Sequence, residues 1–378
     1  RGALTTAEGA LAAAGTDTLQ LAVRRHLDNR AGTIATNGAL QLNAGSANNT
    51  DGVIQAAGTG ATALHTTGTF DNTPGTVATM GASTLTTGDL INNAGVVQAA
   101  SDATLTLDAN GHLDNNGGTL VANGAIDLTA QSLTNAGGVV QSQQGITANV
   151  VSTLDNSGGL IVATGDVTAT AGALLNRDTS LPDATAPTGL FGQRVTLNTD
   201  ALDNTRGQIV ANDALTLRGK SQAGTTLTNV GGVLDGVGTT TVNATNFDNT
   251  GGQLVQRGAD GALALDVSGT LVNANGLIGA EGSGTVHAGV VDNSTGTVFG
   301  QQSLNLSSDG DLRNVAGAVQ SGGDLIVNAG GTLDNTDGTL DATGRAALTA
   351  GRIENVRGQV LASSATDAPA LAVSAAAL

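Results

Sequence analysis

The chain has 378 residues, of which 56 are Gly and four are Phe, and it contains no Cys, Trp or Tyr. Its formal net charge of −17 disfavours nucleic acids and anionic membranes as partners, and the lack of Cys excludes disulfides and Cys-based zinc sites. A hydrophobic content of 39% is too high for a disordered chain, and four Pro without a Gly at every third position exclude collagen.

One motif recurs along the whole chain. It consists of a large apolar residue, any residue, Asn, two residues, Gly, one residue and then Ile, Val or Leu, and its first clear copy runs from Leu27 to Ile34. Sixteen copies follow one another about 22 residues apart, which is the signature of a repeat architecture. The motif Asn residues are Asn29, Asn49, Asn72, Asn92, Asn115, Asn135, Asn156, Asn176, Asn204, Asn229, Asn249, Asn273, Asn293, Asn314, Asn335 and Asn355.

Short strands are expected on both sides of each motif Asn. The apolar residues two before and five after the Asn alternate with polar ones, which is typical of a strand with one buried face. A second strand about eight residues further on is predicted by alternating stretches at 40–42, 105–107, 126–128, 215–217 and 304–306. Two clear strands and a third at the Asn corner make one coil, so we predict an all-β fold, a parallel β-helix (solenoid) of about 16 coils with ~20–22 residues each.

The motif Gly and the motif Asn are expected to have different roles in the turn. Gly lies three residues after the motif Asn in 15 copies, and we expect it to supply a turn with positive φ. We expect Asn to stack as an amide ladder along the turn. The residues expected in this structural ladder are Asn29, Asn49, Asn72, Asn92, Asn115, Asn135, Asn156, Asn204, Asn229, Asn249, Asn273, Asn293, Asn314, Asn335 and Asn355.

The residue before the motif Asn alternates between coils. It is Asp in every odd copy, so the sequence unit is a pair of coils, and we expect these carboxylates to accept hydrogen bonds from backbone N–H groups beside the Asn. Duplication of a two-coil ancestor and avoidance of like charges on adjacent coils both account for the alternation. The eight residues are Asp28, Asp71, Asp114, Asp155, Asp203, Asp248, Asp292 and Asp334.

The repeats predict one continuous β-helical domain over residues 1–378. A surface loop insertion is expected near 177–189, where Thr179 replaces the motif Gly, with the strand resuming at Leu190 and Phe191. Arg1-Gly2 resembles Arg206-Gly207, and Leu378 falls two residues before the next expected Asn. We therefore expect an internal fragment with both ends cut within repeats.

No pattern for catalysis or for a cofactor or metal emerges. His26, His65, His112 and His287 are scattered, and Asp309-Gly310-Asp311 has too few oxygen ligands for a calcium site. Three of the Phe residues occupy or adjoin motif apolar positions and are expected to have a packing role: Phe70, Phe247 and Phe299. A β-helical polysaccharide lyase or hydrolase remains an alternative, but clustered acids and stacking aromatics are missing. We therefore expect that the protein is not an enzyme and has no cofactor.

The repeats resemble those of filamentous haemagglutinin-like exoproteins. The segments 113–120, 154–161 and 247–254 carry this resemblance, each being followed by a short Leu-x-Leu stretch, and it covers essentially the whole chain. It implies a right-handed β-helix exported through an outer-membrane two-partner transporter, and a location in the secreted fraction or on the bacterial cell surface. Members of this family are host adhesins and stick-like effectors of contact-dependent growth inhibition.

Two functions remain open. The first is a structural stalk that presents an adhesive or toxic tip to other cells, with any cell-surface receptor bound outside this fragment. The second is direct binding of a receptor or glycan through the rod face or the 177–189 loop. In both, no nucleic acid is a partner, and no membrane insertion is expected because no run of 18 apolar residues exists.

Overall fold

The computed structural model describes residues 2–180, 187–220, 224–363 and 370–377. These residues form a parallel β-solenoid of about 17 turns with about 21 residues per turn and no helix, which confirms the predicted fold class. Contacts divide the chain into two units, unit 1 (Arg1–Thr179 and Thr185–Gln193) and unit 2 (Ser180–Ala184 and Arg194–Leu378). Each unit is described by itself below.

One coil has three sides and two sheets. In the coil that contains β4 (Thr33–Thr36) and β5 (Leu40–Asn48), the four-residue strand belongs to sheet B and the longer strand to sheet A. Sheet A strands bend at a register shift, such as the one between Ala109 and His112, so that the segment leading to the motif Asn forms the third side. The expected third strand at the Asn corner is therefore confirmed.

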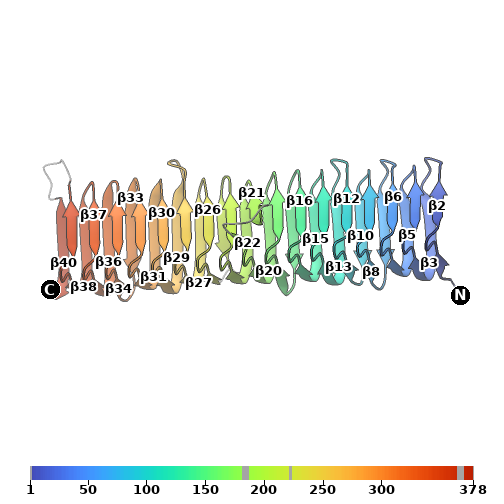
Figure 1. Cartoon of the computed structure of the whole chain (residues 1–378). Coiled ribbons are helices and arrows are strands. Elements are labelled where there is room, and N and C mark those ends of the chain that lie inside the picture. The colour runs from blue at the N-terminus through green and yellow to red at the C-terminus, as the bar shows by residue number, and fades with distance from the viewer. Residues whose placement is uncertain (1, 181–186, 221–223, 364–369, 378) are drawn as a thin grey trace. The chain divides into compact units, whose positions relative to one another are not determined.

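Identical positions stack on one another along each unit, and all described pairings are parallel (Figure 1). In unit 1 the sheet B strands are β2 (Ala10–Ala13), β4, β6 (Val53–Ala56), β9 (Thr76–Thr79), β12 (Val96–Ala99), β14 (Thr119–Ala122), β16 (Val139–Ser142), β19 (Leu160–Ala163) and β21 (Gly189–Gly192). Its sheet A strands are β1 (Leu4–Thr5), β3 (Leu19–Asp28), β5, β7 (Thr62–Thr66), β8 (Phe70–Asp71), β10 (Ser83–Thr87), β11 (Leu90–Ile91), β13 (Leu105–Asp114), β15 (Ile126–Thr134), β17 (Ile146–Val150), β18 (Thr153–Asp155) and β20 (Val167–Leu175).

Unit 2 repeats this arrangement. Its sheet B strands are β23 (Gln208–Ala211), β26 (Val233–Gly236), β28 (Gln253–Gln256), β30 (Leu277–Ala280), β32 (Thr297–Gly300), β35 (Ala318–Ser321), β37 (Thr339–Ala342) and β39 (Gln359–Ala362). Its sheet A strands are β22 (Val195–Asp203), β24 (Leu215–Arg218), β25 (Thr225–Thr228), β27 (Thr240–Asp248), β29 (Ala262–Val272), β31 (Ser283–Asp292), β33 (Ser303–Ser308), β34 (Leu312–Arg313), β36 (Asp324–Asp334), β38 (Ala346–Glu354) and β40 (Leu371–Ala377).

The core of each unit is a column of stacked Leu, Ile, Val and Ala side chains. Phe70 and Phe247 replace the usual Leu before a motif Asn and are fully buried, as expected. Phe299 does not join this column, because it occupies the third position of β32, where the strand alternation directs side chains outward. Phe299 instead packs on the outer face of sheet B, where its ring lies beside Gly279 of the neighbouring strand β30.

The expected insertion falls between Thr179 and β21. Its residues 181–186 lie outside the described residues, and β21 confirms that the strand resumes at Leu190 and Phe191. Leu190 pairs with Ile161, so Leu190 takes the inward position of this coil.

The first coil corrects one expected match. Leu4 pairs with Leu27, and the carbonyl of Gly2 accepts a hydrogen bond from the Arg25 N–H, so Gly2 precedes β1 beside strand β3 and is not at a motif Gly position. The match of Arg1-Gly2 to Arg206-Gly207 is therefore wrong. At the other end β40 pairs with β38 and so belongs to sheet A, and Leu378 lies outside the described residues.

Candidate functional site

The side chains of the motif Asn residues form one hydrogen-bonded row in each unit. Each Nδ2 donates to the Oδ1 of the motif Asn in the next coil over 2.6–2.9 Å, from Asn29 to Asn176 in unit 1. Unit 2 continues the pattern from Asn204 to Asn355 over 2.7 Å. We call these rows the Asn ladders; all amides point the same way, so their dipoles reinforce one another.

The ladder side chains also hold the turn itself. The Nδ2 of Asn115, for example, lies 3.2 Å from the carbonyl oxygen of Gly118 in its own turn and 3.2 Å from that of Val139 in the next coil. The N–H of Gly118 closes the turn by donating to the Asn115 carbonyl over 3.0 Å. Since Asn115 is fully buried, these contacts replace the water that its amide would otherwise bind.

Two ladder residues were not predicted. Asn176 is not among the fifteen expected ladder residues, yet its Oδ1 accepts a hydrogen bond from the Asn156 Nδ2 over 2.9 Å. Thr6 starts the unit 1 ladder, since its hydroxyl donates to the Oδ1 of Asn29 over 2.6 Å. The sequence Leu4-x-Thr6-x-x-Gly9-x-Leu11 carries the signal, because it is the motif with Thr in place of Asn.

The motif Gly is needed for a reason other than the one expected. Its φ is not positive, but a Cβ on Gly118 would lie 2.0 Å from the carbonyl oxygen of Asn92 in the preceding coil. Gly252 and Gly296 show the same distance to Asn229 and Asn273. The prediction of a positive φ at this position is therefore wrong; Gly is required because two backbones approach too closely for a side chain.

The left-handed residue of the turn lies one position earlier, two residues after the motif Asn. It is Gly in only some coils, and ten non-Gly residues adopt φ between 49° and 58° there. No single residue type occupies this position, so it could not be recognised from the residue pattern. The ten are Ala31, Asp51, Ala94, Asp178, Arg206, Asn275, Thr295, Ala316, Asp337 and Arg357.

The row of Asp residues caps the outside of the same turn, as expected. The Oδ1 of each accepts a hydrogen bond from the N–H two residues later, at 2.9 Å for Asp155 and 3.0 Å for Asp248. The other six make the same contact at 3.0–3.3 Å. These carboxylates have a local structural partner, as in Asx turns.

Ion pairs lower two carboxyl pKa values at this turn. Arg30 forms a bidentate ion pair with Asp28, in which Nε and Nη2 each donate to a carboxylate oxygen over 2.8 Å, and this lowers the pKa of Asp28 to about 2. In unit 2 the hydrogen bond from Arg357 lowers the pKa of the exposed Asp337. Both contacts are on the solvent side of the turn, so they are screened by salt.

The histidines are paired with serines or lie alone on sheet A. The Nδ1 of His26, His112 and His287 each contacts a Ser hydroxyl one coil further on. Among the described residues no group of three or more His, Cys, Asp or Glu side chains is arranged to hold a metal ion.

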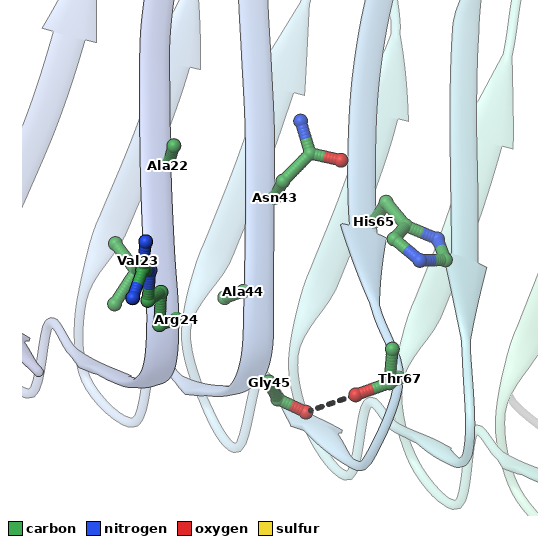
Figure 2. A pocket seen from close by; sticks show the side chains of 8 residues that line it. All are labelled: Ala22, Val23, Arg24, Asn43, Ala44, Gly45, His65 and Thr67. Carbon is green, nitrogen blue, oxygen red and sulfur yellow. Dashed lines mark hydrogen bonds between the residues drawn. The ribbon is translucent and has the colours of Figure 1, made fainter. Parts of the chain in front are cut away.

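One shallow hollow of about 270 Å³ lies on the outer face of sheet A in unit 1. Figure 2 shows Arg24 of β3, Asn43 of β5 and His65 of β7 around it, with the Thr67 hydroxyl donating to the Gly45 carbonyl over 3.1 Å. The hollow is open to solvent and offers hydrogen-bond donors, but no nucleophile with an activating base lines it.

The part of the chain that the structure describes contains no helix of the length and hydrophobicity that a membrane crossing needs. The stacked coils and the Asn ladders define a repetitive β-solenoid protein. A model of the haemagglutinin repeat matches residues 5–73, 59–117, 104–153, 146–182, 194–275, 279–337 and 334–377, so the chain belongs to the haemagglutinin repeat family. No curated protein and no solved structure matches the chain. The haemagglutinin repeat is a structural and adhesive family rather than an enzyme family.

Proposed function

We propose that this chain is the structural stalk of a secreted bacterial exoprotein that presents an adhesive or toxic tip to other cells. The observation that supports this most is the uniformity of the turns. The same buried amide contact recurs from Asn29 to Asn176 and again from Asn204 to Asn355, which stiffens each unit without forming a catalytic or closed binding site. In this proposal the fifteen expected ladder Asn residues, together with Asn176, are structural residues.

The proposal includes one continuous domain over residues 1–378 and export through an outer-membrane two-partner transporter. A chain without Cys can cross that membrane unfolded, since no disulfide forms in the periplasm beforehand. Coil-by-coil stacking on the outside would then favour export in one direction. Surface exposure, measured by protease access on intact cells, is expected only when the transporter is expressed.

Deletion of whole coils tests the stalk role. Removing residues 115–155 takes out two coils and brings Asn156 into register with Asn92, so folding and tip binding should be retained. Removing 115–145 instead joins Asp114 at the end of β13 directly to Ile146 at the start of β17, so one coil loses its Asn turn and its sheet B strand. That coil cannot close, and both folding and tip binding should be abolished. Adhesion or toxicity of the full-length exoprotein is the measurement, and loss of tip binding with retained folding after the first deletion contradicts a passive stalk.

Direct binding to a receptor or glycan is a second candidate, favoured by the hollow in Figure 2. Arg24 has no hydrogen-bond or ion-pair partner among the described residues, so its guanidinium is available to a ligand. Arg24→Ala with His65→Ala should weaken cell adhesion at least about tenfold if this face binds. Deletion of 179–188 tests the loop in the same assay, and unchanged adhesion in both variants rejects direct binding by these two regions.

A further inference from the structure

The outer face of sheet B in unit 1 carries no charge. None of its nine described strands contains an ionisable residue, whereas the sheet A strands of the same unit hold Arg24, Arg25, Asp108 and Asp127 among others. In a chain with a net charge of −17, this face is where a second surface of the same kind can approach without electrostatic repulsion.

The outward side chains of this face are arranged in a symmetric order. The third residues of the successive strands, which we call the outer row, lie side by side through the parallel register. In order they are Ala12, Ala35, Gln55, Ala78, Gln98, Val121, Gln141, Val162 and Phe191. Gln98 of β12 is the middle residue, small residues and one Gln precede it, and large apolar residues and one Gln follow it.

We propose that two copies of this chain pair through sheet B of unit 1, with the order of strands reversed about a two-fold axis that runs along β12. Reversal places each small residue of one copy against a large one of the other, with Ala78 opposite Val121 and Ala35 opposite Val162. It also places Gln98 opposite Gln98 and Gln55 opposite Gln141, so that each amide faces another amide. A two-fold axis makes the contact isologous and closes the assembly at a dimer.

The surface relief of the face fits the same arrangement. Hollows of about 300 Å³ and about 170 Å³ lie over the first half of the outer row, one lined by Ala12, Ala35 and Gln55 and the other by Gln55, Ala78 and Gln98. The bulky Val162 and Val121 project from the second half. Packing bulky side chains into hollows across two stacked sheets is how β-sandwich cores form.

The area of the face is sufficient for a weak dimer. Nine strands about 4.8 Å apart and four residues of about 3.3 Å each give about 550 Å² per copy, or about 1,100 Å² in total. This lies at the lower end for specific interfaces, so we expect dissociation constants of the order of tens of micromolar. Since no ion pair is involved, the association should change little with salt.

Unit 2 supplies the natural contrast. Its sheet B strands carry Asp235 and Asp341 at the outer-row position. Asp235 is buried and takes a hydrogen bond of 2.9 Å from Nε of Arg257, which extends across the face. A second copy would meet these charged groups here, so we place the contact on unit 1 alone.

Sedimentation velocity of the full chain over a concentration series tests the pairing. The wild type should show a monomer–dimer equilibrium, and Val162→Glu should weaken it at least about tenfold because the new carboxylate would be desolvated against Ala35. Thr168→Glu, on sheet A of the same coil, and Val255→Glu, on sheet B of unit 2, are matched controls that should leave the equilibrium unchanged. A wild type that stays monomeric up to about 200 µM, or controls that weaken it equally, overturns the proposal.

Single-cysteine variants test the reversed order independently, because the chain has no Cys of its own. Gln98→Cys lies on the axis and should form disulfide-linked dimers on mild oxidation, whereas Thr106→Cys on sheet A should not. Ala35→Cys should cross-link to Val162→Cys in a mixture and not to itself. Cross-linking of Ala35→Cys with itself instead would show an unreversed order and contradict the two-fold arrangement.

Discussion

The contacts inside the Asn turns are the same in the two units, whereas the residues on the outer face of sheet B differ between them. Gly118 in unit 1 and Gly252 in unit 2 meet the preceding coil at the same 2.0 Å, whereas the outer-row position carries Val162 in one unit and Asp235 in the other. The turn is constrained by contacts to both neighbouring coils, and an outward side chain is not. Substitutions inside the turn should therefore have equal effects in the two units, and substitutions outside it should not.

The largest effect is expected for the motif Gly. In Gly118→Ala and Gly252→Ala the new Cβ meets a backbone oxygen that cannot move without breaking the coil register, so each should cost about 4 kcal/mol of unfolding free energy. Urea unfolding followed by circular dichroism measures it. Gly117→Ala is the control, since a Cβ there meets nothing within 4 Å and only its φ of +60° is unfavourable. Equal costs at Gly117 and Gly118 would contradict the close-approach explanation.

Loss of one ladder amide should come next. Asn135→Ala in unit 1 and Asn273→Ala in unit 2 each leave the Oδ1 of the following motif Asn without its donor in a buried site, which costs about 3 kcal/mol. The same unfolding experiment measures both. Asn355→Ala is the comparison at the end of the ladder, because no later motif Asn loses a donor there. It removes only the acceptor of the Asn335 Nδ2, which keeps its contacts to the Gly338 and Gln359 carbonyls, so it should cost less than about 1 kcal/mol. A similar cost at all three positions would show that the ladder adds nothing beyond the turn.

The motif Gly and the left-handed residue before it show how far this fold can be predicted from the sequence. Period and alternation were sufficient for coils, strands and the Asn ladder, because in a β-solenoid each residue contacts its equivalent one period away. They could not separate a Gly that needs positive φ from a Gly that has no room for a Cβ. The left-handed position was hidden because Ala94, Gly117 and Asn275 all adopt it. Thr6 was missed because a hydroxyl there replaces the amide.

The symmetry of the outer row could not be predicted either. Whole-chain charge says nothing about which face is uncharged until the register assigns each residue to a sheet. Ala35 and Val162 lie near opposite ends of one surface only when the coils are stacked in the observed register.

A smaller effect is expected for the Asp caps outside the turn. Asp155→Ala and Asp248→Ala each remove one acceptor from a partly solvated N–H, so each should cost about 1 kcal/mol. Asn in place of Asp should retain most of the stability, since Asn48 makes the same contact to the Thr50 N–H over 2.9 Å. Thermal unfolding of the four variants decides this, and a loss as large as that of Asn135→Ala would mean that the caps are part of the ladder.

Stabilisation is expected at the left-handed position. Ala94→Gly in unit 1 and Ala316→Gly in unit 2 relieve a φ of 51° and 52°, and the gain is partly offset by greater freedom of the unfolded chain. A net increase of about 0.5 kcal/mol in unfolding free energy is expected for each. Ala78→Gly, in the extended strand β9, should destabilise instead, since Gly there only adds unfolded-state entropy. An increase in unfolding free energy in only one of the two units would contradict the conclusion that their turns are equivalent.

The smallest effect is the pH dependence of the solvent-side ion pairs. The hydrogen bond from Arg30 lowers the folded-state pKa of Asp28 to about 2 from 3.8, so its contribution is fully present above pH 4 and is lost as the pH falls from about 4 to 2. Arg30→Gln should raise this pKa toward the ordinary Asp value, as measured by NMR titration of the carboxyl carbon. In unit 2, Arg357→Gln should raise the pKa of Asp337 in the same direction. The Asp28–Arg30 ion pair lies within one turn, whereas the Asp337–Arg357 ion pair joins adjacent coils. When the terminal coils unfold, the pKa of Asp337 should therefore rise toward the ordinary value while that of Asp28 stays low. An equal rise of both pKa values in the partly unfolded chain would contradict this assignment.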